Sequence, residues 1–246
     1  MQNFTLIIPY YKDSKTIELV VKKAVKFLDN YAKLYEIIIV NDGSPDNPFA
    51  LLNKIKKKYS NINILHHKNN LGYGATFKSG FTKSQYDLIL MIDGDDEYDI
   101  FEFKKFLNLI DYYELIIGFR YKKLYSTKRI FISYFYNFLV RFMFKTNFRD
   151  ISTGIRFAKK SLFESINFDT LSNSPFFGAE LVIRAMVHGF PIGQVGIQTF
   201  PRSFGTGSSI TFKNIYLTIK DLIRVYKNIF SDDYDLPEHR YRKRGK

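Results

Sequence analysis

The feature that most constrains this sequence is a series of short apolar runs that alternate with segments of helical spacing. Residues 36–40 and 87–92 are almost wholly apolar, as in strands that are buried on both faces of a parallel sheet. Residues 4–9 and 62–66 have the same character, and the segments between the runs are long enough for crossover helices. This alternation predicts right-handed βαβ units, and therefore an α/β fold with a mostly parallel sheet flanked by helices.

Polar clusters follow the predicted strands directly. One comes after Pro9, one surrounds Asp42, and one begins at Asp93. Ligands of open α/β sheets bind beyond the carboxyl ends of the strands. These clusters therefore mark the expected functional site.

The cluster after residues 87–92 is rich in carboxylates. Asp93, Asp95 and Glu97 stand at i, i+2 and i+4, so they share one side of the chain if it stays extended. Hard oxygen ligands of this kind suit Mg²⁺ or Mn²⁺, and such a cation could neutralise a diphosphate. The alternative is an ordinary acidic turn without a ligand.

Length and composition limit the organisation of the chain. Its 246 residues, 46% of them hydrophobic, suffice for one compact domain, which we expect over 1–230, with a basic and flexible tail at 231–246. The absence of cysteine excludes disulfides, thiolate zinc sites and a cysteine nucleophile. We find no secretory signal, and the longest uncharged apolar stretch, 130–140, is too short to span a membrane. These observations predict a cytoplasmic location.

Charge is distributed unevenly along the chain. The net charge is +13, and residues 115–149 hold eight Lys or Arg and eleven Phe or Tyr but no carboxylate. Such a block prefers anionic partners, namely lipid headgroups, phosphorylated substrates or nucleic acid. Residues 130–148 are predicted to form an interfacial helix in the headgroup plane of a membrane, and core packing of the same aromatic residues is the alternative.

Several short motifs occur in an order that resembles a known family. The segments are Pro9-Tyr10-Tyr11-Lys12-Asp13, Val40-Asn41-Asp42-Gly43-Ser44, Asn70-Leu71-Gly72-Tyr73-Gly74 and Asp93-Gly94-Asp95. Together they resemble the nucleotide-sugar domain of family 2 glycosyltransferases with the GT-A (Rossmann-like) fold. The later segments are Gly118-Phe119-Arg120-Tyr121, Asp150-Ile151-Ser152-Thr153-Gly154-Ile155-Arg156, and the loop that begins at Arg202. These are similar to the dolichyl- or polyprenyl-phosphate sugar synthase branch.

The resemblance implies a donor site in residues 1–112 and an acceptor site in residues 113–230. It assigns the nucleotide sugar, with UDP or GDP as the nucleotide, to Pro9, Tyr11, Asp13, Asp42, Gly72, Asp93 and Gly94. It implies a metal site formed by Asp93, Asp95 and Glu97. Lys12, Asp13 and Asn41 depart from the usual family pattern, which bears on the identity of the nucleotide.

The resemblance also assigns phosphate-binding and catalytic groups. Arg120, Arg129 and Ser133 match positions that hold the acceptor phosphate, and Arg202 matches the arginine that reaches the donor diphosphate. A guanidinium suits this work because its planar fork binds phosphate oxygens in pairs. Glu180 matches a carboxylate that would serve as general base if the acceptor were a sugar hydroxyl.

The function that follows is metal-dependent, inverting transfer of a sugar from a nucleoside diphosphate to a polyprenyl-phosphate acceptor. A glycan hydroxyl in cell-surface polysaccharide synthesis is the alternative acceptor. We expect attachment to an anionic membrane at its inner face, directly or through a membrane-protein partner. The rivals are a sugar-nucleotide binder without turnover and a basic nucleic-acid- or membrane-binding protein without catalysis. Nucleic acid is not expected, because no RRM, KH or helix-turn-helix signature occurs.

Overall fold

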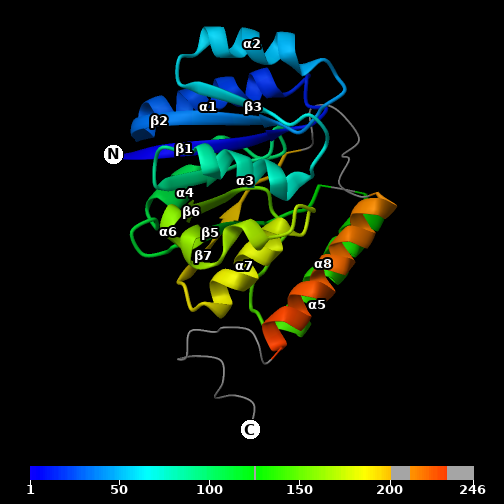
Figure 1. The fold of residues 1–246 in the computed structure, drawn as a ribbon. Helices are drawn as coiled ribbons and strands as arrows, with labels where there is room; N and C mark the ends of the chain where they lie inside the picture. Colours follow the sequence, from blue (N-terminus) through cyan, green and yellow to red (C-terminus); the bar gives the residue numbers. More distant parts are fainter. Residues whose placement is uncertain (125, 201–210, 232–246) are drawn as a thin grey trace.

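A computed structural model describes residues 1–124, 126–200 and 211–231 and shows a sheet covered by helices on both faces (Figure 1). The strands of the described chain form one sheet in the order β3-β2-β1-β4-β6-β5-β7. They are β1 (Gln2–Tyr10), β2 (Ala32–Asn41), β3 (Ile62–His66), β4 (Leu88–Met91), β5 (Leu115–Arg120), β6 (Arg156–Lys159) and β7 (Ile192–Ile197). All neighbouring strands are parallel except that β6 runs antiparallel to both β4 and β5. The predicted, mostly parallel α/β sheet is confirmed.

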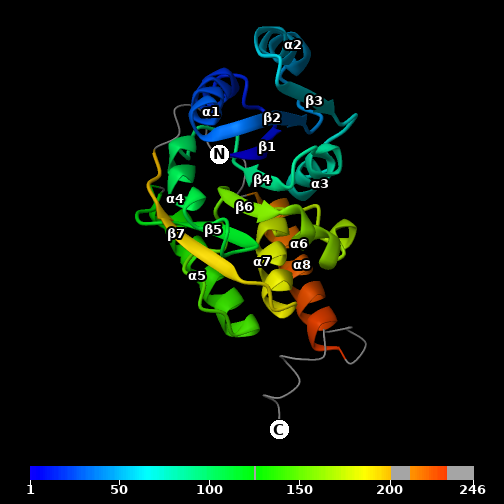
Figure 2. The same cartoon turned by 90° about the vertical axis from the view of Figure 1, so that its left-hand side faces the viewer.

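The helices divide between the two faces of the sheet. Those of the described chain are α1 (Ile17–Tyr31), α2 (Pro48–Lys58), α3 (Tyr73–Lys83), α4 (Phe103–Leu107), α5 (Thr127–Phe144), α6 (Lys160–Ser165), α7 (Phe177–Val187) and α8 (Phe212–Phe230), with short 3₁₀ turns at η1 (Ile100–Glu102) and η2 (Phe168–Thr170). Helices α1, α2 and α4 pack on one face, and α3, α5, α6, α7 and α8 on the other. Helices α5, α7 and α8 gather at the end of the molecule away from α2 (Figures 1 and 2).

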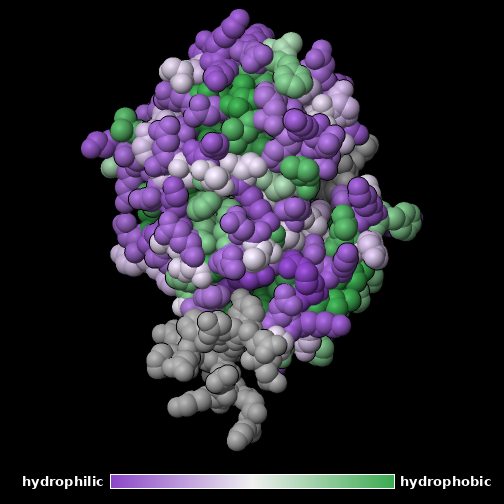
Figure 3. All heavy atoms as spheres, in the orientation of Figure 1, coloured by the Kyte–Doolittle hydropathy of each residue, from purple (hydrophilic) through white to green (hydrophobic). Residues whose placement is uncertain are grey.

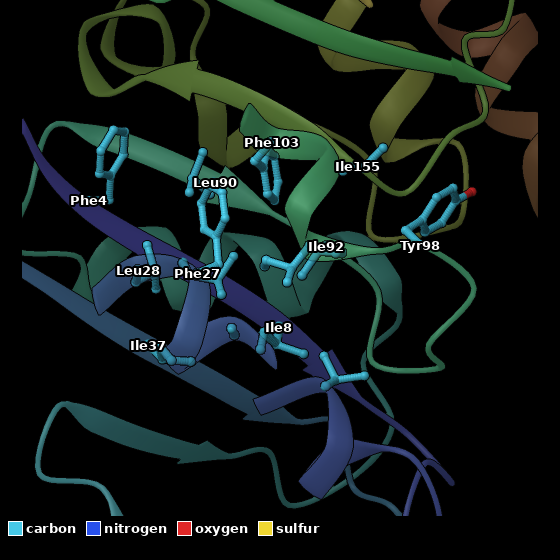
Figure 4. Packing of buried hydrophobic residues seen from close by; sticks show 14 of the residues in the cluster. Phe4, Ile8, Phe27, Leu28, Ile37, Leu90, Ile92, Tyr98, Phe103 and Ile155 are labelled. Atoms are coloured by element: carbon cyan, nitrogen blue, oxygen red, sulfur yellow. The ribbon is translucent and has the colours of Figure 1, made fainter. Parts of the chain in front are cut away.

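Each face has its own hydrophobic core. On the first face, Phe27 of α1 and Phe103 of α4 lie against Leu90 of β4 (Figure 4). On the second face, the rings of Phe77 in α3 and Phe177 in α7 are stacked with centroids 5.6 Å apart. Because apolar side chains leave both faces of β1, β2 and β4, these strands are buried in the centre of the sheet, as their composition predicts.

The antiparallel strand β6 is not among the strands that the sequence pattern predicted. It is only four residues long and pairs with β4 on one side and β5 on the other. Through this strand, residues 1–112 and residues 113–230 share a continuous sheet. Most of the tail that we predicted at 231–246 lies outside the described residues.

Helices α5 and α8 carry many exposed apolar side chains. On α5 the rings at positions 131, 135, 138 and 142 follow helical spacing along one side, each more than half exposed. On α8 the exposed apolar residues at positions 212, 216, 219, 223, 226 and 230 form a second stripe. The helices approach each other where the ring of Phe144 lies 5.8 Å from that of Tyr226. We call these two stripes together the α5–α8 aromatic face.

Candidate active site

A cleft with a volume of about 840 Å³ opens beyond the carboxyl ends of β1, β2 and β4. Its walls come from the polar clusters after these strands, from the turn before β6, and from α5, α7 and α8. Of the predicted site residues, the cleft brings together Pro9, Tyr11, Asp42, Gly72 and Asp93. The position matches the site expected for an open α/β sheet.

Asp42 fastens the loop that forms one wall of the cleft. Its Oδ1 accepts a hydrogen bond from the backbone N–H of Leu71 at 2.8 Å and lies 2.7 Å from Nδ1 of His67. Its Oδ2 accepts from the backbone N–H of Gly72 at 2.9 Å. Gly72 has φ +103°, a conformation open to glycine but strained for other residues. Asp42 therefore shapes the entrance to α3 as well as lining the cleft.

Asp93 lies at the floor of the cleft. Its Oδ1 accepts a hydrogen bond from the hydroxyl of Tyr73 at 2.8 Å. Burial, followed by the nearby negative charge of Asp95, raises the pKa of Asp93 to about 7. A buried carboxyl beside a second carboxyl is a place where a cation would be stabilising. The pair supplies hard oxygen ligands, so Asp93 and Asp95 fit Mg²⁺ or Mn²⁺.

Glu97 does not join these two carboxylates. It is 3% exposed and lies 3.7 Å from Nη1 of Arg120, whereas Oδ1 of Asp95 accepts from the backbone N–H of Glu97 at 3.1 Å. In the part of the chain that the structure describes, no group of three His, Cys, Asp or Glu side chains converges to hold a metal. The structure does not bring Glu97 together with Asp93 and Asp95, because the chain turns after Asp95 and does not stay extended.

Asp13 and Gly94 border the cleft without lining it. The carboxylate of Asp13 accepts from the backbone N–H of Tyr11 at 3.3 Å, and Asp13 faces a neighbouring hollow of about 350 Å³. A side chain at Gly94 would come within 2.8 Å of the carbonyl oxygen of Pro9, so glycine allows the loop after β4 to pass the end of β1. Both residues shape the loops that carry the donor-side residues.

Arg120 is held by a cluster of buried partners. Its Nε donates to Asp150 at 2.7 Å, and its Nη2 donates to Asp150 at 3.1 Å and to the hydroxyl of Ser152 at 2.9 Å. Burial alone would raise the pKa of Asp150, but the charge of Arg120 and its hydrogen bonds outweigh that effect and hold the pKa below its usual value. The guanidinium predicted to bind the acceptor phosphate is thus already paired with a carboxylate of its own chain.

The other predicted phosphate-binding residues lie near this cluster. The hydroxyl of Ser133 accepts from Nζ of Lys123 at 2.7 Å, and Lys123 also lies 3.6 Å from Asp150. Arg129 is half-buried on the first turn of α5. The three residues predicted to hold the acceptor phosphate, Arg120, Arg129 and Ser133, do not line the cleft. Arg202 lies outside the described residues.

Glu180 is fully buried and does not line the cleft. One carboxylate oxygen accepts from Nη2 of Arg184 at 2.8 Å, and the other from Nη2 of Arg224 at 2.9 Å and the hydroxyl of Ser172 at 2.7 Å. These contacts fasten α7 to α8. The predicted role of Glu180 as a general base does not fit this surrounding, because both oxygens are engaged and water is excluded.

The structure also adds residues that the sequence analysis did not assign. Tyr73 orients Asp93, Tyr136 of α5 lines the cleft, and Arg156 of β6 reaches its floor. Tyr73 and Arg156 belong to the motifs that carry the family resemblance, so the sequence marked both residues but indicated no role for them. Tyr136 gave no signal beyond the aromatic character of its helix.

Comparisons with known proteins identify the family and the fold of the chain. The model of the family described as "Glycosyl transferase family 2" matches residues 5–166. The chain is 25% identical over 225 residues to polyprenol monophosphomannose synthase of Mycolicibacterium smegmatis, covering 87% of this chain and 83% of that protein. It is 24% identical over 206 residues to glycosyltransferase AglD of Haloferax volcanii, covering 80% of this chain.

A third relative is dolichyl-phosphate beta-glucosyltransferase ALG5C of Trichomonas vaginalis, 34% identical over 127 residues, or 47% of this chain. The matched part spans only 33% of the Haloferax protein and 38% of the Trichomonas protein. Among solved structures, glucosyl-3-phosphoglycerate synthase of Mycobacterium tuberculosis in complex with Mn²⁺, UDP and phosphoglyceric acid superposes with a TM-score of 0.72. That match covers 96% of this chain and 80% of the other at 13% identity. The fold is that of the GT-A glycosyltransferases.

Proposed function

The chain belongs to glycosyl transferase family 2 and is a glycosyltransferase, and from this premise we propose that it transfers a sugar from a nucleoside diphosphate to a polyprenyl phosphate. The observation that carries the proposal is the cleft of about 840 Å³, with carboxylates on its floor and the helices of the α5–α8 aromatic face in its wall. This arrangement supports binding of a charged nucleotide donor and a lipid-linked acceptor at one site.

The donor end of the cleft supports binding of a nucleoside diphosphate. Tyr11 offers a ring that can stack on a nucleobase, and Asp42 offers carboxylate oxygens that can accept from a base N–H. The loop that Asp42 fixes places Gly72 at the start of α3, where backbone without a side chain can approach a ligand closely. We assign the nucleotide to this end, with uracil or guanine as the candidate base.

Asp93 and Asp95 would hold a divalent cation, and the donor diphosphate would complete its shell. That cation would supply charge stabilisation for the departing nucleoside diphosphate. The chain's own contribution is to hold Asp93 in place through the hydrogen bond from Tyr73. The solved complex of the mycobacterial synthase contains Mn²⁺ and UDP, which supports the same assignment here.

A phosphate acceptor needs no general base, because its oxygen is already anionic. The buried and paired state of Glu180 therefore favours the lipid phosphate over a glycan hydroxyl as the acceptor. The names of two relatives, a polyprenol monophosphomannose synthase and a dolichyl-phosphate glucosyltransferase, support the same choice. Direct displacement by the acceptor oxygen would invert the anomeric centre.

The α5–α8 aromatic face supports docking on an anionic membrane. Helix α5 has no carboxylate, and the one on α8, Asp221, accepts from the hydroxyl of Ser174 at 2.6 Å. Lys128 and Lys220 are among the exposed cations of these helices, and each cation near an anionic leaflet contributes about 1 kcal/mol. Hydrophobic and hydrophilic side chains are interleaved where the two helices lie (Figure 3). None of the helices that the structure describes has the length and apolarity needed to cross a bilayer.

Transfer itself tests the proposal. Purified protein is incubated with UDP- and GDP-sugars and a short-chain polyprenyl phosphate, with and without Mn²⁺. We expect a glycosylated lipid phosphate that forms only with metal, and no product from Asp95→Asn. Transfer to a glycan but not to the lipid phosphate would overturn the acceptor assignment, and unchanged activity of Asp95→Asn would overturn the metal assignment.

Flotation with vesicles tests the docking surface. We expect the protein to bind vesicles containing anionic lipid, and the double variant Phe135→Ser/Phe138→Ser to lose most of this binding. Tyr112→Ser is the matched control, because Tyr112 is 73% exposed but lies away from α5 and α8. Equal losses in control and variant, or binding to neutral vesicles alone, would contradict the assignment.

A further inference from the structure

Arg156 is a buried cation with few hydrogen-bond partners in the described chain. It stands on β6, is 2% exposed and lines the cleft. Its Nη2 donates to the carbonyl oxygen of Ile151 at 3.1 Å, and its Nε has no hydrogen-bond partner. Within the ranges that the structure describes, the guanidinium forms no ion pair. The other buried side-chain atoms without a partner there belong to Asn3 and Thr146, neutral residues away from the cleft.

The fold fixes the position of this guanidinium. In the sheet register, Arg156 lies between Met91 of β4 and Ile117 of β5, so its backbone is held on both sides. Its side chain packs against the first turn of α7, where a methyl group at Gly178 would overlap the guanidinium. A charged group with so little freedom is preorganised for whatever it binds.

Burying a guanidinium without a counter-ion is unfavourable. Asp93 interacts with Arg156 electrostatically, but it accepts its hydrogen bond from Tyr73 and stands beside Asp95. The contrast with Arg120, which has Asp150 and Ser152 as close partners, shows that this chain supplies polar partners to another buried arginine.

We propose that Arg156 binds a phosphate group of a substrate inside the cleft, and that this group is the acceptor phosphate. The inference rests on the proposed transfer to a phosphate acceptor. It adds Arg156 to the phosphate contacts expected of Arg120, Arg129 and Ser133. Tyr136 and Ser152 line the cleft with it and, like Arg156, come from the acceptor half of the chain. A guanidinium held by one bond keeps other N–H groups available for phosphate oxygens.

The first experiment measures binding without turnover. Melting temperatures of the wild type, Arg156→Met and Arg156→Lys are compared without ligand, with UDP and Mn²⁺, and with inorganic phosphate added to the UDP–Mn²⁺ complex. We expect Arg156→Met to melt no lower than the wild type without ligand, since it removes an unpaired buried charge. We expect phosphate to bind it about ten- to a hundredfold more weakly while UDP still protects it.

The outcomes separate the two possible sources of phosphate. If Arg156→Met lost the protection by UDP but kept the protection by inorganic phosphate, Arg156 would bind a phosphate of the donor and not the acceptor phosphate. A large fall in the melting temperature without ligand, with both protections intact, would overturn the proposal and make Arg156 structural. Arg141→Met is the matched control, because Arg141 is exposed on α5 and does not line the cleft.

The second experiment measures turnover. With a short-chain polyprenyl phosphate, we expect Arg156→Lys to raise KM for the acceptor about tenfold or more and to leave KM for the donor within about twofold. Unchanged acceptor KM would count against the proposal. If the wild type transferred sugar to no lipid phosphate, the proposed function would fail, yet the binding experiment would still decide whether Arg156 holds phosphate.

Discussion

Two buried arginines in the same half of the molecule have opposite surroundings. Arg120, at the end of β5, has two hydrogen bonds to Asp150 and one to Ser152. Arg156, at the start of β6, has one bond to a backbone carbonyl. Removing one partner of a buried ion pair leaves an uncompensated charge and destabilises the fold, whereas a buried charge without an ion pair is unfavourable until a ligand pairs with it. Residue type and motif do not separate the two roles, and hydrogen-bond partners do.

The largest effect that we expect comes from breaking the satisfied pair. Asp150→Asn leaves Arg120 and Lys123 buried with a neutral amide in place of their common carboxylate. Removing one partner of a buried ion pair destabilises by about 3–5 kcal/mol. For a chain of this size we expect a melting temperature about 10 °C lower, measured by calorimetry or circular dichroism.

The melting temperature of Arg156→Met provides the second half of the comparison between the two arginines. Arg156→Met, which removes the arginine with few hydrogen-bond partners, should leave the melting temperature equal to that of the wild type or higher. If both variants lost the same stability, the contrast between the two arginines would have no energetic meaning.

The effect of Asp150→Asn should depend on pH. The folded pKa of Asp150 lies below its usual value, so its charge contributes stability that is fully present above about pH 4. That contribution is lost as the pH falls through the lowered folded pKa. We expect the gap in melting temperature between wild type and variant to be constant from pH 7 to 5 and to close in more acidic buffer. If the difference in melting temperature persisted at the lowest pH at which both proteins fold, packing and not charge would account for it.

A smaller effect is expected for Glu180, whose oxygens join α7 to α8. Glu180→Gln keeps the shape of the side chain but weakens charged hydrogen bonds from Arg184 and Arg224. We expect a loss of about 3 kcal/mol of unfolding free energy, the upper end for hydrogen bonds to charged groups. Glu180→Asp, which keeps the charge, is the control. A fall in kcat of a hundredfold or more with little change in stability would instead restore the role of general base.

Local sequence pattern predicted that the residues expected on the donor side would lie together at one edge of the sheet. The buried runs that became β1, β2 and β4 place Pro9, Asp42 and Asp93 at one edge of the sheet, because the ends of parallel strands meet there. These residues follow their strands directly, so their positions depend on short-range information. The same reasoning does not place Glu97, because the direction of the chain after Asp95 depends on a turn and not on strand geometry.

The acceptor side depends on contacts between distant parts of the sequence. Arg120 meets Asp150 across 30 residues, and Glu180 meets Arg224 across 44. Residues 115–149 contain no carboxylate, so the sequence suggested that Arg120 would be open to phosphate. Its partner in the structure, Asp150, is the first residue after that block. Strand β6, which carries Arg156, is too short for periodicity to reveal, and only its pairing with β4 and β5 makes it a strand.

The smallest effect that we predict tests how tightly the floor of the cleft is packed. A methyl group at Gly154 would overlap the carboxylate of Asp93, which lies in the cleft and is held by Tyr73. Gly154→Ala should cost about 2 kcal/mol of stability through overpacking. It should also weaken UDP–Mn²⁺ protection, because Asp93 must move.

Gly196→Ala is the matched control for this variant. The atoms nearest to its methyl group would belong to the side chain of Tyr121, which is 68% exposed and can rotate away. We therefore expect a change below about 0.5 kcal/mol for Gly196→Ala, as for ordinary surface substitutions, with metal and nucleotide binding intact. Urea unfolding and UDP–Mn²⁺ titration of both variants provide the measurement. If Gly154→Ala bound metal and nucleotide as the wild type does, the position of Asp93 would be less important for the site than its contacts indicate, and Asp95 would remain as the principal ligand.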